Sequence, residues 1–300
     1  MENIKDYSFR WRWNMVNDFR PQSIESSGIK SYPTANYVNY YGMQNGYPIN
    51  DMTKADAESG YDPTHPWKNR DPRFYKTIMF DGVKWRNTGG AGGTAELFTG
   101  GRESEEANEK KGCFTAYMNS KLCPQLMNTF DGYKENNIMI LSLMRLADVY
   151  LMYAEATAVG YNSPKGKAAT YSLTAEEALN KIRERAGVAP VLEKFLGSTA
   201  DFLSELRRER AVELSFEGFR FTDLRRWMLL TQYPYTLKTK IEFDRADPNN
   251  YNYDAPEENA IKNLREVVLI ERKYTDRHYW YPLPKKDVSM YEGFYQNPGW

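Results

Sequence analysis

The stretch LRRERAVELSFEG at residues 206–218 decides how this chain folds. Glutamates recur every four residues in and just before it, at Glu205, Glu209, Glu213 and Glu217. A helix places residues at this spacing on one face, where like charges repel by about 0.2–0.5 kcal/mol per pair. The helix is therefore stable only if arginines lie among the glutamates. We expect Arg208 to pair with Glu205 and Arg210 to pair with Glu213.

A row of carboxylates also allows a catalytic interpretation, in which one acid is protonated and one base is ionised. Catalytic carboxylate pairs usually come from different strands or loops that face a cleft, not from one arginine-rich helix face. We therefore favour an Arg–Glu network that joins two packed helices. In this interpretation Arg220, Arg225 and Arg226 approach the glutamates from a following helix, predicted at residues 222–230.

Helices are also predicted upstream of the glutamates. Apolar residues at helical spacing from Leu143 to Ala158 form one stripe of about five turns. The next helix opens at Thr174 with a capping box, TAEE, and ends at Gly187. The glutamate helix follows at about 199–217. Because the first two helices start roughly 33 residues apart, close to a tetratricopeptide repeat, we expect antiparallel helical pairs.

The remaining segments do not keep a helical period. Gly and Pro recur every few positions in residues 1–140, where we expect strands at 74–80 and 112–118 around a glycine-rich excursion. Residues 244–260 indicate a solvated loop, and 266–270 indicate a strand or a short helical turn. The prediction is a mainly α fold with tetratricopeptide-like helical pairs, a large loop-rich irregular portion and a few short strands.

The helical pattern and its absence divide the chain into three parts of one structural unit. Residues 1–140 form a loop-rich, aromatic-rich portion that we expect to face the ligand. Residues 141–230 form the helical core, and residues 231–300 form an irregular C-terminal portion that we expect to pack on the helices.

Composition excludes several classes of protein. The 300 residues carry 40 basic and 40 acidic side chains, and this balance argues against a nucleic-acid binder. No apolar run of about 18 residues is present, and the first residues do not form a signal sequence. With 2 Cys and 2 His, a zinc site is not expected, and we predict neither a metal site nor a cofactor.

Several motifs, in the right order over roughly residues 70–300, resemble those of the SusD/RagB family. They are DPRF at 71–74, RLADVYLMYAEA at 145–156, ALNKIRERAG at 178–187, ELSFEGFR at 213–220, DLRRW at 223–227, YPLP at 281–284 and NPGW at 297–300. The resemblance implies a largely helical body with tetratricopeptide-like pairs, carrying a loop-rich portion that builds the ligand surface.

The resemblance also implies a function. Members are lipid-anchored proteins of the cell outer membrane that capture glycans, or in some members peptides, at the cell surface. They pass the ligand to a TonB-dependent, SusC-like transporter. Members extend further on the N-terminal side, where the signal peptide, the lipid-bearing cysteine and the first helical repeats lie. We therefore expect this chain to be the C-terminal portion of a longer precursor.

Aromatic side chains near the N-terminus are the candidate ligand contacts, because sugar C–H faces stack on aromatic rings. Residues 1–85 contain sixteen aromatics, many of them beside Gly, Pro or Asn, in loops where recognition residues tend to lie. We predict ligand-binding roles for Trp67, Trp85, Tyr61, Tyr47, Tyr41 and Tyr40.

Other functions compete with non-catalytic glycan binding. A glycosidase would need two carboxylates about 5 to 10 Å apart in a cleft, and the sequence nominates no such pair and no nucleophile motif. We therefore predict no catalytic residue and no enzyme activity. A peptide-binding member of the same family, or a helical interaction scaffold without a small ligand, stays open; the loop aromatics argue against a pure scaffold.

Overall fold

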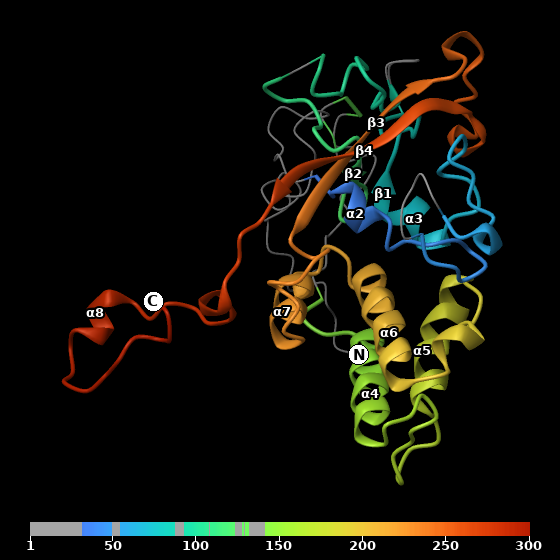
Figure 1. The fold of residues 1–300 in the computed structure, drawn as a ribbon. Coiled ribbons are helices and arrows are strands. Elements are labelled where there is room, and N and C mark those ends of the chain that lie inside the picture. The colour runs from blue at the N-terminus through green and yellow to red at the C-terminus, as the bar shows by residue number, and fades with distance from the viewer. Residues whose placement is uncertain are drawn as a thin grey trace.

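The helical part of the protein is a bundle of long helices at one end of the molecule (Figure 1). The computed structural model describes residues 32–49, 55–87, 93–107, 109–123, 128, 130–131 and 142–300. In the bundle α4 (Leu146–Gly160) packs on α5 (Ala175–Ala186), and α6 (Thr199–Glu213) packs on α4 and α5. Their shared core is apolar and includes Leu151, Ala154, Leu179, Ile182, Phe202 and Leu206.

The ends of α5 confirm the sequence prediction. The Thr174 hydroxyl accepts a hydrogen bond from the Glu177 amide, and the Glu177 carboxylate accepts one from the Thr174 amide at 2.7 Å. Gly187 follows the helix with a φ of 74°, a conformation that glycine adopts without steric cost. The chain is helical here as predicted, whereas a tetratricopeptide-like pairing geometry stays a prediction.

The glutamate helix is shorter than predicted. Helix α6 ends at Glu213, and α7 spans Phe219–Arg226 and so begins before residue 222. The turn between them contains two residues in the left-handed region, Phe216 with a φ of 59° and Gly218 with a φ of 85°. This turn separates Glu217 from the regular helix that carries the other glutamates.

The loop-rich portion contains short elements. They are α2 (Ala35–Val38), α3 (Pro72–Thr77), β1 (Ile78–Met79) and β2 (Met118–Asn119), with β1 antiparallel to β2. The predicted strand at 74–80 is wrong over its first residues, which belong to α3. The Asp71 carboxylate caps this helix by accepting from the Arg73 amide, and Pro72 suits its first position. The predicted strand at 112–118 is reduced to its last residue, Met118.

A long antiparallel ribbon crosses the loop-rich portion (Figure 1). It joins β3 (Leu237–Arg245) to β4 (Ile261–Glu271). The predicted strand at 266–270 is part of β4, whereas nothing in the sequence analysis anticipated β3. Short 3-10 helices lie at Ala57–Ser59, Glu193–Phe195, Pro248–Asn250, Pro256–Glu258 and Asp276–Tyr279.

The C-terminal portion packs on the helices only in part. Tyr279 joins Leu224 and Leu230 in a small buried cluster beside α7. Beyond this point an arm that carries α8 (Lys285–Val288) extends away from the body (Figure 1). The Tyr281 ring at the start of the arm lies 4.1 Å from the Arg225 guanidinium of α7, whereas most aromatic side chains further along the arm are exposed.

A buried arginine organises the loops around it. The fully buried Arg70 guanidinium donates to the backbone carbonyl oxygens of Val38, at the end of α2, and of Tyr41, Gly42 and Pro66 in the loops, at 2.8–3.3 Å. It also lies 4.7 Å from the centre of the Phe74 ring. Because buried carbonyls need donors, one cation connects several segments of the loop-rich portion.

Candidate ligand-binding site

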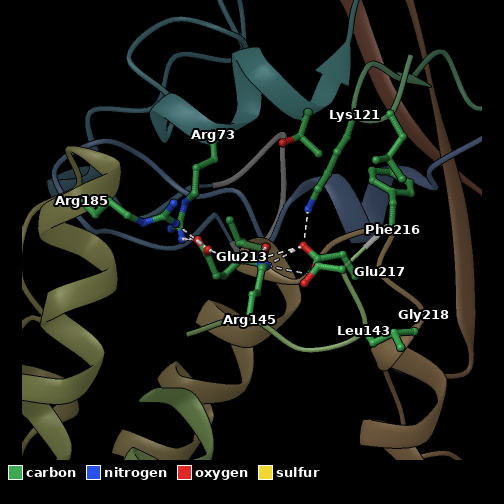
Figure 2. Close-up of a pocket in the computed structure, with 13 residues that line it drawn as sticks. Arg73, Lys121, Leu143, Arg145, Arg185, Glu213, Phe216, Glu217 and Gly218 are labelled. Atoms are coloured by element: carbon green, nitrogen blue, oxygen red, sulfur yellow. Dashed lines mark hydrogen bonds and ion pairs between the residues drawn. The ribbon is translucent and has the colours of Figure 1, made fainter. Parts of the chain in front are cut away.

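The glutamates of α6 and Glu217, here called the glutamate face, are held by cations from several elements (Figure 2). Arg73 of α3 approaches Glu209 and Glu213 at 2.5 and 2.9 Å. Arg145, just before α4, reaches Glu213 and Glu217 at 2.5 and 2.8 Å. Further partners are Arg183 and Arg185 of α5, and Lys121.

The predicted partners of this face are only partly correct. Arg208 pairs with Glu205, as its three-residue spacing predicts. Arg210 does not pair with Glu213. It lies on another side of α6 and binds Asp148 of α4 at 2.5 Å and Asp223 of α7 at 2.7 Å.

The arginines of the following helix also do not reach the glutamate face. Arg226 pairs with Asp223 and with Glu155 of α4. Arg225 donates to the Tyr279 carbonyl, and Arg220 lies over the Tyr40 ring. In the described structure, none of these three arginines forms an ion pair with a glutamate of the glutamate face.

The charges around the glutamate face lower the pKa of every carboxyl in it. Burial by itself would raise the pKa of Glu209, but Arg73 and Arg183 outweigh burial and lower the pKa to about 2. The pKa values of Glu205, Glu213 and Glu217 are lowered in the same way. A general acid needs a raised pKa, so these carboxylates behave as structural anions and the catalytic interpretation loses its support.

A cavity of about 740 Å³ opens beside the glutamate face (Figure 2). Arg73, Arg145 and Lys121 contribute to its wall together with Glu213 and Glu217. Each of these charged groups already forms an ion pair with another one in the wall. The polar wall is therefore satisfied from within the protein.

A second cavity, of about 550 Å³, has a different character and is called here the tyrosine–arginine pocket. It lies where the segment after α2, the helices α6 and α7, and the start of the β3/β4 ribbon meet. The side chains that define it are Tyr40, Tyr233, Tyr235, Arg207, Arg220 and Asn39. Aromatic rings and hydrogen-bonding groups thus converge in one cavity, as is typical of small-ligand sites.

Several polar atoms of this pocket are buried without a hydrogen-bond partner among the described residues. They are Asn39 Oδ1, Arg207 Nε and Arg220 Nη1. The Arg220 guanidinium carbon lies 4.8 Å from the Tyr40 ring centre and 5.6 Å from that of Tyr235. A buried polar atom without a partner costs roughly 1–3 kcal/mol, which a ligand could recover by binding there.

Three of the predicted ligand residues are buried. Trp67 is completely inaccessible, packs against Phe80 with ring centres 5.0 Å apart, and donates from its indole nitrogen to the Tyr117 hydroxyl. Tyr41 is equally buried and donates to the Ser215 hydroxyl at 2.7 Å. Trp85 is 5% exposed. The expectation that these rings form an accessible shelf is therefore corrected, since they build the core of the loop-rich portion.

The other predicted ligand residues retain accessible surface. Tyr40 lines the tyrosine–arginine pocket. Tyr47 is half-buried, donates to the Glu58 carboxylate at 2.7 Å, and has the Lys194 ammonium 4.4 Å from its ring centre. Tyr61 is half-buried against the aromatic core. The structure brings only Tyr40 of the predicted set into this pocket, and ligand roles for Tyr47 and Tyr61 stay predictions.

The sequence analysis missed the other aromatic residues of the pocket. Tyr233 and Tyr235 flank Pro234 in the turn before β3, and the Tyr233 side chain is 77% exposed. A signal was present in the sequence, because two tyrosines flank a proline shortly after the helix predicted at 222–230. It was overlooked because the search was confined to the first 85 residues.

Two absences hold for the part of the chain that the structure describes. No described helix combines the length and apolar character that crossing a bilayer requires. No described group of three or more His, Cys, Asp or Glu side chains is arranged to hold a metal ion.

Comparison with known proteins identifies the family. The sequence model of the SusD family matches residues 1–300, so the chain belongs to this family. A SusD-like protein from Bacteroides fragilis has a similar structure, with a TM-score of 0.64 and 22% identity over 100% of this chain and 52% of its own. A SusD-like carbohydrate-binding protein from the same organism follows, with a TM-score of 0.56 and 20% identity over 85% of this chain and 46% of its own.

These likenesses show a SusD-like fold. The chain spans about half the length of the solved structures it resembles. No curated protein matches the sequence.

Proposed function

We propose that this chain is the non-catalytic, glycan-binding part of a cell-surface nutrient-uptake protein. It binds an oligosaccharide and delivers it to a TonB-dependent, SusC-like transporter in the outer membrane. A lipid anchor attaches the full-length precursor to this membrane. Membership of the SusD family supports this proposal, and so does the similarity to a SusD-like carbohydrate-binding protein.

The tyrosine–arginine pocket is the observation that carries the binding role. Tyr233 offers an exposed ring, and Tyr40 and Tyr235 place two further rings around Arg220. Sugar rings stack on such faces through C–H groups, while nearby polar atoms take the hydroxyls. The low pKa values on the glutamate face support a non-catalytic role, because they leave no protonated acid there.

Isothermal titration calorimetry against a panel of oligosaccharides tests glycan binding. We expect Tyr233→Ala to weaken the best ligand by about tenfold, a loss of about 1.4 kcal/mol, because the variant removes the most exposed ring surface of the pocket. Tyr253→Ala is the matched control, because this partly exposed tyrosine lies in the loop between β3 and β4 and outside the pocket. Equal affinity of Tyr233→Ala and wild type would reject the pocket as the site.

Product formation and peptide binding separate the alternatives. Purified protein incubated with a bound glycan should leave it intact, whereas new reducing ends would favour a glycosidase. Binding of peptides but of no glycan would favour a peptide-binding member of the family. Binding of neither would favour an interaction scaffold.

Delivery to a transporter needs its own test in cells. Affinity purification of the tagged full-length protein from outer membranes should recover a SusC-like barrel in a stable ratio. Protease treatment of intact cells should degrade the tagged protein if it lies on the surface. Recovery of the protein without any barrel would contradict the proposed partnership.

A further inference from the structure

Two arginines of the tyrosine–arginine pocket lack carboxylate partners among the described residues. Arg208, which also lines the pocket, pairs with Glu205, and outside the pocket Arg226 and Lys240 pair with Asp223 and Glu242. By contrast, Arg207 and Arg220 of the pocket form no ion pair with any described carboxylate. The Arg207 guanidinium lies 5.4 Å from the Trp227 ring centre, and Arg220 lies over the Tyr40 ring.

A further cation, Lys238 of β3, lies outside the lining of the pocket. It stands between Leu237 and Thr239, which line the pocket, and neighbouring side chains of a strand point to opposite faces. Burial and, after it, the charges of Arg272 and Arg220 lower the pKa of Lys238 to about 8. Lys238 therefore adds positive charge near the pocket but is not one of the side chains that would contact its ligand.

The two carboxylates that line the pocket interact with groups other than Arg207 and Arg220. Glu205 is held by Arg183 and Arg208, and Glu266 accepts a hydrogen bond from the Thr239 hydroxyl. The hydroxyl does not remove the charge of Glu266, so the lining contains three arginines and two glutamates, and neither glutamate forms an ion pair with Arg207 or Arg220 in the described structure. The pocket thus keeps an excess of positive charge in a partly buried place, where charges interact more strongly than in water.

Asn39 is the remaining polar group of the pocket, and it indicates a second property of the ligand. Asn39 lines the pocket and is 6% exposed. Its Oδ1 accepts no hydrogen bond from the described residues. A hydroxyl is the natural donor for a carbonyl oxygen of this kind. A ligand that combines an anionic group, hydroxyls and a stackable ring face satisfies the arginines, Asn39 and the tyrosines together.

We propose that the tyrosine–arginine pocket binds an acidic sugar of a glycan, with Arg220 and Arg207 contacting its carboxylate or sulfate. This inference rests on the proposed glycan-binding function and adds the class of ligand. The sugar ring stacks on Tyr233 or Tyr235, and a ring hydroxyl donates to Asn39. Arg207 supplies a second guanidinium on the α6 side.

Matched pairs of charged and neutral ligands test the inference. Calorimetry at about 150 mM NaCl, where long-range attraction is screened, compares oligogalacturonides with their methyl esters, and sulfated carrageenan oligosaccharides with their desulfated forms. We expect the charged member of at least one pair to bind at least tenfold more tightly, and the pair that responds distinguishes a carboxylate from a sulfate.

Substitutions then assign the effect to the pocket. Arg220→Met and Arg207→Met should each weaken the charged ligand by about tenfold while changing the neutral partner less than about twofold. Lys240→Met is the control, because Lys240 lies on β3 outside the pocket lining and pairs with Glu242 at 2.8 Å. Thermal unfolding checks that each variant is folded, and Arg207→Met carries the test if Arg220→Met is not folded.

The outcomes separate the two proposals. Equal binding of charged and neutral partners overturns the acidic-sugar inference and leaves the glycan-binding function intact. If Arg220→Met weakens the charged and the neutral ligand equally, the inference is also overturned, because the arginine would then act through packing alone. Binding of no glycan in the panel overturns both.

Discussion

The two cavities beside α6 differ in how their charges are satisfied. Around the glutamate face, cations from α3, from α5 and from the residue before α4 meet the carboxylates of one helix face (Figure 2). In the tyrosine–arginine pocket, Arg207 and Arg220 lie against aromatic rings and form no ion pair with a described carboxylate. The same residue type thus serves two purposes in one helical body.

The difference shows that an arginine's partners, and not its presence, indicate its role. Buried charges that are fully paired connect elements, and removing one partner leaves the other uncompensated. An unpaired buried charge carries an uncompensated desolvation cost, and a ligand of opposite charge can offset this cost by binding there. Four measurements test this difference between the two cavities.

Loss of a paired arginine should have the largest effect. Arg183 is fully buried and binds Glu205 and Glu209, so Arg183→Met leaves two buried carboxylates short of a partner. We expect the free energy of unfolding, measured by urea denaturation, to fall by about 3–5 kcal/mol. Arg220→Met, which breaks no ion pair with a described carboxylate, should cost less than about 1 kcal/mol. A similar loss in both variants would contradict the distinction between the two cavities.

A second contrast concerns aromatic residues. Trp67→Ala empties the core of the loop-rich portion and should lower the free energy of unfolding by about 3–5 kcal/mol. Tyr233→Ala removes a ring that is 77% exposed and should change it by no more than about 0.5 kcal/mol. Calorimetric melting of both variants provides the measurement. A large destabilisation by Tyr233→Ala would mean that the pocket rings are structural.

Acid should lower the free energy of unfolding by protonating the glutamate face. Its carboxyls have lowered pKa values in the folded protein, so the unfolded chain takes up protons first as the pH falls. The stabilisation is therefore present above about pH 4.5, the ordinary glutamate value, and is lost as the pH falls toward about 2, the pKa of Glu209. Urea unfolding at several pH values measures this, and Glu209→Gln should flatten the dependence. A flat profile in wild type would contradict the ion-pair network.

An exposed ion pair should matter least. Lys165 pairs with Glu176 near the start of α5, but its side chain is 69% exposed. We expect Lys165→Met to change the free energy of unfolding by less than about 0.5 kcal/mol, because water and salt screen such pairs. A loss comparable to that of Arg183→Met would show that burial does not explain the strength of the buried network.

Local signals in the sequence predicted the helices well. The capping box at Thr174 and the glycine at 187 place α5 correctly, because these signals depend on residues within one turn. The Asp71-Pro72 pair carried an equally local helix signal that the sequence analysis did not use, and a strand was predicted in place of α3. Strand β3 was missed because its pairing with β4 is not local.

The candidate site was harder to predict. Tyr40 was chosen for its loop-like surroundings and lines the pocket, whereas Trp67 and Tyr41 were chosen in the same way and lie in the core. Nothing in their immediate neighbours distinguishes these residues. Their exposure depends on segments distant in the chain, such as Phe243 of β3, which packs against Trp67 with ring centres 5.3 Å apart.

The amino-acid sequence by itself determined the helical body, its caps, the need for a charge-paired glutamate face and the family to which the chain belongs. Those properties follow from spacing and from contacts within a few turns. Only the tertiary structure decided which cations neutralise Glu213 and which, like Arg220, stay without a carboxylate partner in the described structure. Pairing of charges requires side chains within about 4 Å, and residues as far apart in sequence as Arg73 and Glu213 meet only when the chain is folded.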